Sequence, residues 1–574
     1  MIAAAAMIFS LASCSVNDVE KPGVITADKT TAYAKVVISM PNVTGTRVDF
    51  TPGEKDGSFD VGSTDESKIK SINLAFYDEN GTYVCQASLD SELEDLGSAE
   101  SNNVSNSYAQ VLRVIIPEGV NKPTQVVAFI NTDVKTNNLD ELYKNGGVTA
   151  NAFKEGDYFV MTNSGYYDGG EDYVIAVPVT LFSTEAEADE AKTEEEGMTV
   201  IYVERLAAKI TVDVKKQDDE VKIDQEEANY VVKSVEDESV TLKYTPNFWG
   251  ATGTAQEENL VKTQFEKTAT WMNAAGQHRS YWAESVHYTT DPYPTADDSP
   301  LTYLTFDEIA GNTPKNMNTV GKPNYVFEHT ASVGIEGMDL ISNTYVIVTG
   351  NYQVYVNGKE DTEVYYKDGK VNFYLLSLGV DANEKLEDGE ENPDFGKSVF
   401  RIFNETQLMK YLLGYNGISA VYEDKDGTEI EDAKLADFFE LKYKVGEDGV
   451  GKYYLAILDK DVYVADEEGS YKELETEEDS TLKKSTNSRH YYFPEGGAYF
   501  NVPIVQNLSD KTYGVVRNHS YVLTIEKIQS LGAPLDENKF APDDPVIPDP
   551  NFDNYINAKI NILSWHVVEH GVTL

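Results

Sequence analysis

The sequence predicts a mainly all-β protein, and three observations support this. Short apolar segments recur with turn-forming clusters between them, such as Asp78-Glu79-Asn80-Gly81, which is the spacing of a sandwich or barrel. Tyrosine, at 37 residues against 22 Phe and 4 Trp, suits half-buried strand positions with one wet edge. The long amphipathic helices that alternate with strands in parallel-sheet enzymes are missing from the sequence.

The first expected strand is Tyr33–Met40, where apolar and polar residues alternate with the period of a half-buried strand. One face carries Ala34, Val36, Ile38 and Met40. A loop rich in Pro, Gly, Thr and Asp follows, and Arg47 lies in it, directly before Val48. An arginine in such a loop is an accessible cleavage point for a trypsin-like protease.

Further strands are expected in both halves of the chain. They are Ile69–Tyr77, Tyr108–Ile116, Thr124–Asn131, Tyr173–Phe182, Tyr345–Thr349, Tyr352–Val356, Lys370–Leu376, Tyr453–Leu458, Ala498–Val505 and Ser520–Ile528. The charged run Thr184–Gly197 is expected to form a short exposed helix or a loop.

The length of 574 residues predicts more than one domain, because single cores stop growing at about 250 to 300 residues. We place the boundary near Arg205, which gives an N-terminal domain over 48–205 and a C-terminal domain with insertions over 206–550. Leu535–Pro550 has the composition of a flexible Pro/Asp linker. An isolated apolar segment, 551–574, follows it.

The charge of the chain excludes some partners. With 97 acidic and 47 basic residues the formal net charge is -50, which opposes binding to nucleic acid or to anionic lipid through a basic patch. Of the two cysteines, Cys14 lies in the apolar leader, so Cys85 has no partner for an intramolecular disulfide in the mature chain.

The first 14 residues form an expected signal peptide that ends in Leu11-Ala12-Ser13-Cys14. This ending resembles a lipobox, in which small residues admit a signal peptidase and the cysteine thiol carries a lipid. The alternative is an ordinary signal peptide with an unrelated cysteine. The polar stretch Ser15–Thr31 is expected to be a tether.

The sequence offers no motif for catalysis. Seven histidines show neither HExxH nor a zinc spacing, and GxSxG, P-loop and GxGxxG motifs are absent from the sequence. We therefore expect no enzyme activity, no cofactor and no metal site. Two aromatic clusters, Trp271–Trp282 and Tyr491–Phe493, could stack on sugars, although such residues more often pack in cores.

The tail contains a second alternating segment, Ala558–Ile562, and the alternation breaks near Leu563-Ser564, which implies a bulge or bend that divides the tail into two pieces around Trp565. Such a strand can add to a groove of another chain or dock as the last strand of its own domain. For the first case the expected buried residues are Ile560, Ile562, Trp565, Val567, Val572 and Leu574.

Both ends of the chain resemble Bacteroidales fimbrillins, and their order and spacing are most similar to the shaft-forming major subunit of the short fimbriae, a type V pilus. The resemblance lies in the leader with Cys14, the strand followed by Arg47, and three phrases: Val203–Ile210, Arg517–Ile528 and Ile562–Val567.

This resemblance implies two transthyretin-like β-sandwich domains with a C-terminal donor-strand extension. It implies a precursor lipidated on Cys14 and carried to the outer membrane, its only contact with a membrane. An arginine-specific surface protease then removes 15–47 by cutting between Arg47 and Val48. The tail 551–574 of a neighbouring subunit fills the groove left behind, so identical subunits form an adhesive surface fimbria with anchor and tip proteins.

Two other functions remain open at this stage. The chain could be a surface glycan-binding lipoprotein that stays monomeric and uses its aromatic clusters. It could also be a surface hydrolase, for which the sequence provides no motif.

Overall fold

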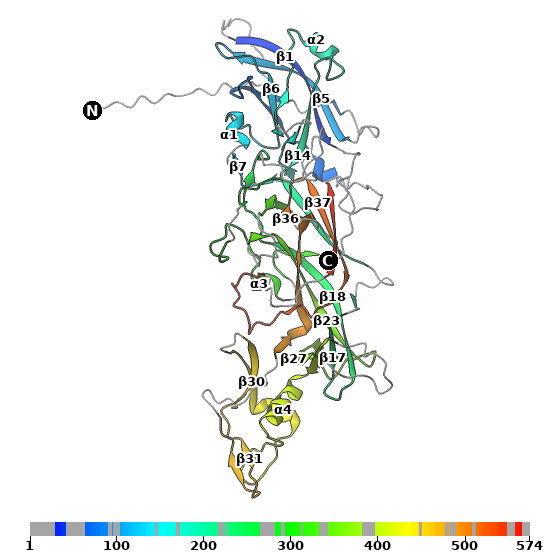
Figure 1. The fold of residues 1–574 in the computed structure, drawn as a ribbon, viewed down its shortest axis with the longest axis vertical. Coiled ribbons are helices and arrows are strands. Elements are labelled where there is room, and N and C mark those ends of the chain that lie inside the picture. Colours follow the sequence, from blue (N-terminus) through cyan, green and yellow to red (C-terminus); the bar gives the residue numbers. More distant parts are fainter. Residues whose placement is uncertain are drawn as a thin grey trace, which may run out of the picture.

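A computed structural model shows groups of β-sheets stacked along one long axis, with the N-terminal strands at one end (Figure 1). The structure describes residues 29–41, 64–89, 94–95, 104–143, 147–167, 173–215, 223–224, 228–263, 282–288, 293–311, 314–331, 342–380, 396–446, 450–476, 482, 489–507, 512–547 and 557–564. Strands dominate these residues, and the longest helix among them is α4 (Glu405–Tyr415). The all-β prediction is confirmed.

The N-terminal sheet folds over on itself around one core. Its strand order is β3 (Tyr83–Leu89), β2 (Ile72–Tyr77), β6 (Gln125–Ile130), β10 (Met161–Asn163), β14 (Thr199–Arg205), β1 (Lys29–Pro41), β5 (Val104–Pro117) and β4 (Glu94–Asp95), with β13 (Val177–Pro178) pairing to β6. β3 and β5 come from opposite parts of this order and contact each other. Alternate residues of these strands, including Phe76, Leu112 and Ile201, therefore meet in a shared core.

Two further sheets face each other in the C-terminal part. The first has the order β21 (Asn324–Phe327), β15 (Ala207–Val214), β37 (His519–Lys527) and β39 (Asn557–Ser564). The second has the order β33 (His490–Phe493), β27 (Phe373–Val380), β28 (Ser398–Phe403), β17 (Tyr230–Lys233), β18 (Ser239–Thr252), β23 (Tyr345–Val356), β34 (Gly497–Pro503) and β38 (Ala533–Pro534). Val212, Trp249 and Leu523 belong to the core between them.

Further short strands and three short helices accompany these sheets. They are β7 (Thr149–Ala150), β8 (Lys154–Glu155), β9 (Tyr158–Phe159), β11 (Tyr166–Tyr167), β12 (Tyr173–Val174), β16 (Ile223–Asp224), β19 (Glu258–Asn259), β20 (Asn318–Thr319), β22 (His329–Thr330), β24 (Lys359–Glu360), β25 (Tyr366–Lys367), β26 (Lys370–Val371), β35 (Val505–Asn507), β36 (Thr512–Val515), α1 (Leu139–Tyr143), α2 (Glu185–Glu190) and α3 (Phe306–Ile309). Of these strands, β16, β20 and β24 join the large C-terminal sheet, and the others pair in small sheets of their own.

The N-terminal and C-terminal sheets are joined by continuous chain and by an apolar cluster. β14 of one sheet runs into β15 of the other through the buried Leu206. Leu206 packs in a cluster with Phe129, Leu260, Phe327 and other residues from both sides. The two neighbouring strands therefore hold the N-terminal and C-terminal sheets in contact.

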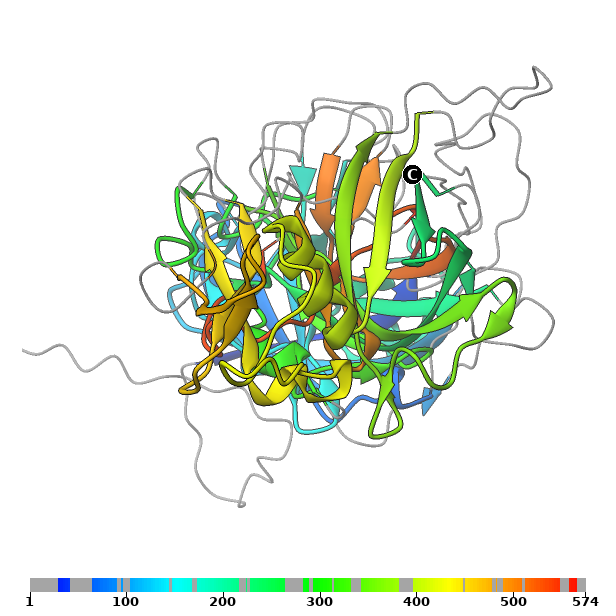
Figure 2. The same cartoon turned by 90° about the horizontal axis from the view of Figure 1, so that it is seen from below.

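A separate small lobe, which we call the insert, lies at the other end of the molecule (Figures 1 and 2). It contains α4, β29 (Phe439–Val445), β30 (Gly451–Ile457), β31 (Tyr463–Ala465) and β32 (Tyr471–Glu473). Helix α4 begins at an Asn404 capping box and buries Leu408, Met409, Leu412 and Leu413 against the hairpin β29–β30.

Most predicted strands are present, but some are joined and others are divided. Tyr345–Val356 is one continuous strand, β23, and not two. Lys370–Leu376 is divided between β26 and β27, and Ala498–Val505 between β34 and β35. Tyr173–Phe182 is not a single strand, because only β12 and β13 form in it and Pro178 lacks the N–H that a longer ladder needs. The charged run predicted as a helix or loop contains α2, whose Thr184 cap accepts a bond from Glu187 N.

The predicted flexible linker Leu535–Pro550 is wrong for Leu535–Ile547. This segment is packed along the C-terminal sheets, with Asp536 and Val546 buried. The sequence signal was composition alone, and long-range contacts override it. The division of the chain near Arg205 stays a prediction. Among the described residues, none of the helices has the length and apolar character needed to cross a membrane.

Candidate polymerisation site

β1 lies between two strands of the N-terminal sheet. It pairs in parallel with β14, where Val36 lies opposite Thr199, and antiparallel with β5, where Val37 lies opposite Ala109. We call the position between β14 and β5 the acceptor slot. A strand in this slot has backbone hydrogen bonds on both edges.

The side chains of β1 complete the core of the N-terminal sheet. Ala34, Val36 and Ile38 are almost fully buried there, as their alternation predicts. On the other face Val37 is also buried, and Lys35 Nζ donates to the backbone oxygen of Asp189 in α2 at 3.0 Å. Removal of β1 would therefore open a core and two strand edges together.

β39 forms the edge of the four-stranded C-terminal sheet. It pairs antiparallel with β37, where Ile562 lies opposite Tyr521 and Ile560 opposite Leu523. In this single chain the tail thus lies on its own domain, which is one of the two arrangements that the sequence left open. Here β39 has one neighbouring strand, whereas β1 has two.

The remaining predicted site residues are outside the described part of the chain. They are Cys14, Arg47, Val48, Trp565, Val567, Val572 and Leu574. Of Ile560 and Ile562 the structure describes the backbone pairing only. Their strand, β39, pairs with β37 and not with β1.

A buried ionic cluster near the start of β37 was not found from the sequence. Arg517 is fully buried, its Nε lies 3.1 Å from Glu328 Oε1, and its guanidinium donates to the backbone oxygens of Asn259 and Leu260. Lys262 Nζ pairs with Glu204 Oε2 of β14 at 3.1 Å. These pairs join β14 to the segment that leads into β37.

The predicted sugar-binding aromatics are packed, as far as the structure describes them. Trp282 and Phe493 are buried, and the ring of Tyr492 stacks on Tyr374 with centroids 4.3 Å apart. Trp271 and Tyr281 lie outside the described residues. Described aromatics of the two clusters therefore form no open platform.

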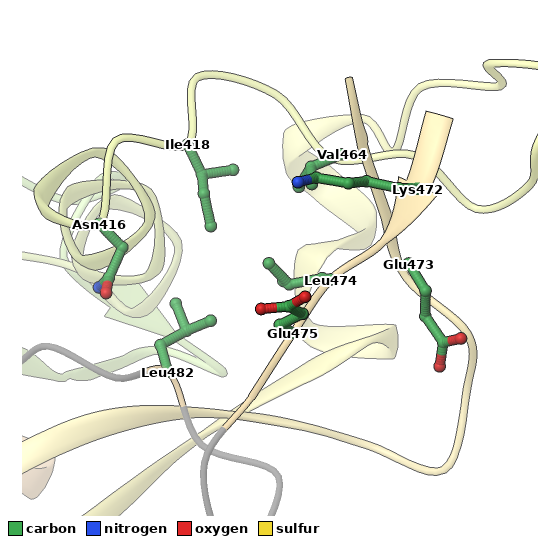
Figure 3. Close-up of a pocket in the computed structure, with 8 residues that line it drawn as sticks. All are labelled: Asn416, Ile418, Val464, Lys472, Glu473, Leu474, Glu475 and Leu482. Atoms are coloured by element: carbon green, nitrogen blue, oxygen red, sulfur yellow. The ribbon is translucent and has the colours of Figure 1, made fainter. Parts of the chain in front are cut away.

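A cavity of about 260 Å³ lies in the insert, between α4 and the β31–β32 hairpin (Figure 3). Ile418, Leu474 and Leu482 line it together with Lys472 and Glu475, among others. None of its described lining residues is aromatic, so it lacks the stacking surface of a sugar site. Among the residues the structure describes, no group of three or more His, Cys, Asp or Glu could hold a metal ion.

Comparison with known proteins identifies the C-terminal region. Residues 491–570 match the family model of the C-terminal part of fimbrillin, major fimbrial subunit protein type IV. This range contains β33 apart from its first residue, His490, and all of β34 to β39. No curated protein sequence matches.

Solved structures give only distant likenesses. One is a proposed cell adhesion protein from Parabacteroides distasonis, at 11% identity and TM-score 0.33, over 93% of this chain and 99% of that one. Another is a proposed cell adhesion protein from Bacteroides eggerthii, at 9% identity and TM-score 0.29, over 93% and 96%. A third is the tip fimbrial protein Mfa3 from Porphyromonas gingivalis, at 11% identity and TM-score 0.26, over 93% and 100%.

At these TM-scores the structural neighbours add nothing to the assignment, which rests on the family match. A fimbrillin is a component of a fimbria at the cell surface, together with other fimbrial proteins. The match at residues 491–570 agrees with the resemblance seen in the sequence at Arg517–Ile528 and Ile562–Val567. The C-terminal region of this chain, residues 491–570, is therefore of the fimbrillin type.

Proposed function

We propose that the chain is a structural pilin that polymerises by protease-triggered donor-strand exchange and supports adhesion. Cleavage between Arg47 and Val48 by an arginine-specific surface protease releases β1. The donor strand β39 of a second copy then enters the acceptor slot. Identical subunits form the fibre, and anchor and tip fimbrial proteins join it.

One observation supports this most strongly: the donor repeats the pattern of the strand that it replaces. Ala558-Lys559-Ile560-Asn561-Ile562 has the same residue types as Ala34-Lys35-Val36-Val37-Ile38 at four of five positions, and at the fourth Asn561 stands in place of Val37. With the two segments aligned, Ile560 and Ile562 take the core positions of Val36 and Ile38. The donor would then run parallel to β14 and antiparallel to β5, as β1 does.

The number of neighbouring strands favours the exchange. On β37 the donor has backbone hydrogen bonds along one edge, and in the acceptor slot it would have them along both. Burial of each large apolar side chain contributes about 1.5 to 3 kcal/mol before ordering costs are subtracted. The second row of backbone hydrogen bonds, together with this burial, favours a long-lived contact between subunits.

The precursor is anchored through a lipid on Cys14, and the anchor is lost with β1 at cleavage. Mass spectrometry of fibres sheared from cells should therefore find mature subunits that begin at Val48. Cys14→Ala should abolish lipid labelling and leave unprocessed precursor short of the surface. Fibres that retain Tyr33–Met40 would refute the exchange, and normal fibres from Cys14→Ala would refute the lipid route.

A monomeric glycan-binding lipoprotein is the alternative, and unboiled surface fractions distinguish the two. A pilin should run as a ladder of multimers on a gel, whereas the alternative should run as one band.

A further inference from the structure

We propose that Ala533–Ile547 is a strap, docked on the insert and on α3, that holds the base of the donor tail and limits how far β39 can reach. This inference rests on the proposed function, because reach matters only if β39 serves a second copy. The strap begins at β38, which pairs with β34 through Pro534 and Ala533.

The first anchor joins the strap to the hairpin of the insert. The Tyr453 hydroxyl in β30 donates to Asp536 Oδ2 at 2.5 Å, and both residues are buried. Asp536 Oδ1 accepts from the backbone N–H of Asn538 at 3.0 Å, which fixes the turn of the strap. The Asp536 carboxylate is thus held by Tyr453, 83 positions earlier in the chain, and by Asn538 of the strap itself.

The second anchor is Lys539, which lies against two tyrosine rings. Its Nζ is 5.7 Å from the ring centroid of Tyr443 in β29 and 5.0 Å from that of Tyr491 in β33. These are cation–π distances, and partial desolvation strengthens such contacts. The hairpin β29–β30 therefore supplies one ring and one hydroxyl to the strap.

The third anchor is α3 with Leu304, which lies just before it. The ring of Phe540 stacks on that of Phe306 with centroids 5.1 Å apart. Val546 is buried, and its N–H donates to the Leu304 oxygen at 2.7 Å. Phe306 N–H donates in return to the Asp544 oxygen at 2.9 Å. The strap is thus held by backbone and side-chain contacts nearly to its end.

Chain length then sets the reach of the donor. Between Ile547 and Asn557 lie nine residues, 548–556, which span at most about 30 Å when extended. Release of the strap back to Pro534 would add the thirteen residues 535–547 and extend the reach to about 75 Å. A short linker keeps the effective concentration of donor near its acceptor high and restricts the angles between subunits.

The test compares a strap variant, Lys539→Ala with Phe540→Ala, with a control of two exposed strap residues, Glu537→Ala with Asp543→Ala. In the uncleaved monomer, hydrogen exchange at the Val546 amide should be at least about tenfold faster in the strap variant and unchanged in the control. If the strap variant fails to fold, Phe540→Leu alone provides the same comparison.

The second measurement uses fibres grown from cleaved protein. The strap variant should still polymerise, and electron microscopy should show a longer or more variable axial repeat and stronger bending than wild type or control. Unchanged exchange at Val546 would refute docking of the strap, and an unchanged repeat and stiffness would refute its control of reach. Absence of wild-type polymers would refute the proposed function instead, and the exchange measurement would still decide whether the strap is docked.

Discussion

Ile562 of β39 lies opposite Tyr521 of β37, at the edge of the four-stranded sheet. Tyr521 is fully buried, and its hydroxyl accepts a hydrogen bond from Val516 N–H at 2.7 Å. This hydrogen bond of Tyr521 does not involve β39. Because β39 has one neighbouring strand and β1 has two, the tail can leave its sheet with a smaller loss of backbone hydrogen bonds than β1.

Val36→Ala should destabilise the precursor and leave the cleaved protein unchanged. Val36 is 1% exposed in the N-terminal core, so the smaller side chain should cost about 1 to 3 kcal/mol of unfolding free energy. Cleavage removes β1, so the cleaved protein no longer contains position 36 and its stability should not change. Denaturant titrations before and after cleavage measure both values, with the exposed Val235→Ala as control. Equal destabilisation of both forms would show that β1 stays bound.

Deletion of Asn551–Leu574 should leave a folded monomer that is still cleaved but cannot polymerise. β39 is an edge strand, so its loss removes one ladder and leaves both cores in place. Thermal melting before cleavage, followed by circular dichroism, measures this. Loss of cooperative folding would mean that the tail is an integral strand of its own domain. Trp565→Ala is a milder variant, which should weaken the ladder of multimers on a gel without unfolding either domain.

Acid should destabilise the fold partly through His490. Burial lowers the pKa of His490 to about 4, and its Nδ1 accepts a bond from Tyr453 N–H at 3.0 Å. The unfolded state binds the proton near pH 6.5, so this contribution to stability is present above that pH. It is lost as the pH falls from 6.5 toward 4, by about 2 to 4 kcal/mol.

His490→Gln keeps an acceptor for Tyr453 N–H and does not titrate. Its free energy of unfolding should therefore fall less between pH 6.5 and 4 than that of wild type. An identical pH profile in urea titrations of the two proteins would contradict the neutral, buried state of His490.

Arg517→Met should destabilise the protein by about 3 to 5 kcal/mol, because Glu328 would remain buried with its cationic partner removed. Adding Glu328→Gln should recover part of this loss, since the second change removes the unpaired charge. Thermal melts of the single and double variants give the comparison. A double variant no more stable than Arg517→Met would show that the pair acts through shape and not through charge.

The alternation of apolar residues predicted the elements that have one wet face. Ala34, Val36 and Ile38 alternate along the chain with residues of the opposite face of the strand. This pattern predicted both the strand and the face that it buries. The same pattern in Ala558–Ile562 predicted a strand but not its partner, since β37 and the acceptor slot both accept a strand of this kind.

The strap and the ionic cluster could not be predicted, because distant residues stabilise them. Arg517 and Glu328 are 189 positions apart, and single-sequence patterns do not report such a pair. In the strap the proline and aspartate content indicates a flexible linker, whereas Tyr453 and Phe306 order it through contacts that local composition does not contain.

The acceptor slot provides the most direct test of donor-strand exchange between copies. In β1, Val37 lies opposite Ala109 of β5, and the alignment of the two strands gives Asn561 the position of Val37. On its own domain Asn561 lies opposite Val522. Cysteines at paired positions of adjacent strands are close enough to form a disulfide. A chain with both Asn561→Cys and Val522→Cys should form an internal disulfide and stay monomeric until it is reduced.

The decisive measurement mixes two cleaved variants, one with Asn561→Cys and one with Ala109→Cys, and identifies disulfide-linked peptides in the fibres by mass spectrometry. Exchange into the slot predicts a disulfide between position 561 of one copy and position 109 of another. Fibres that form without this cross-link, while β39 remains paired with β37 of its own chain, would contradict the account.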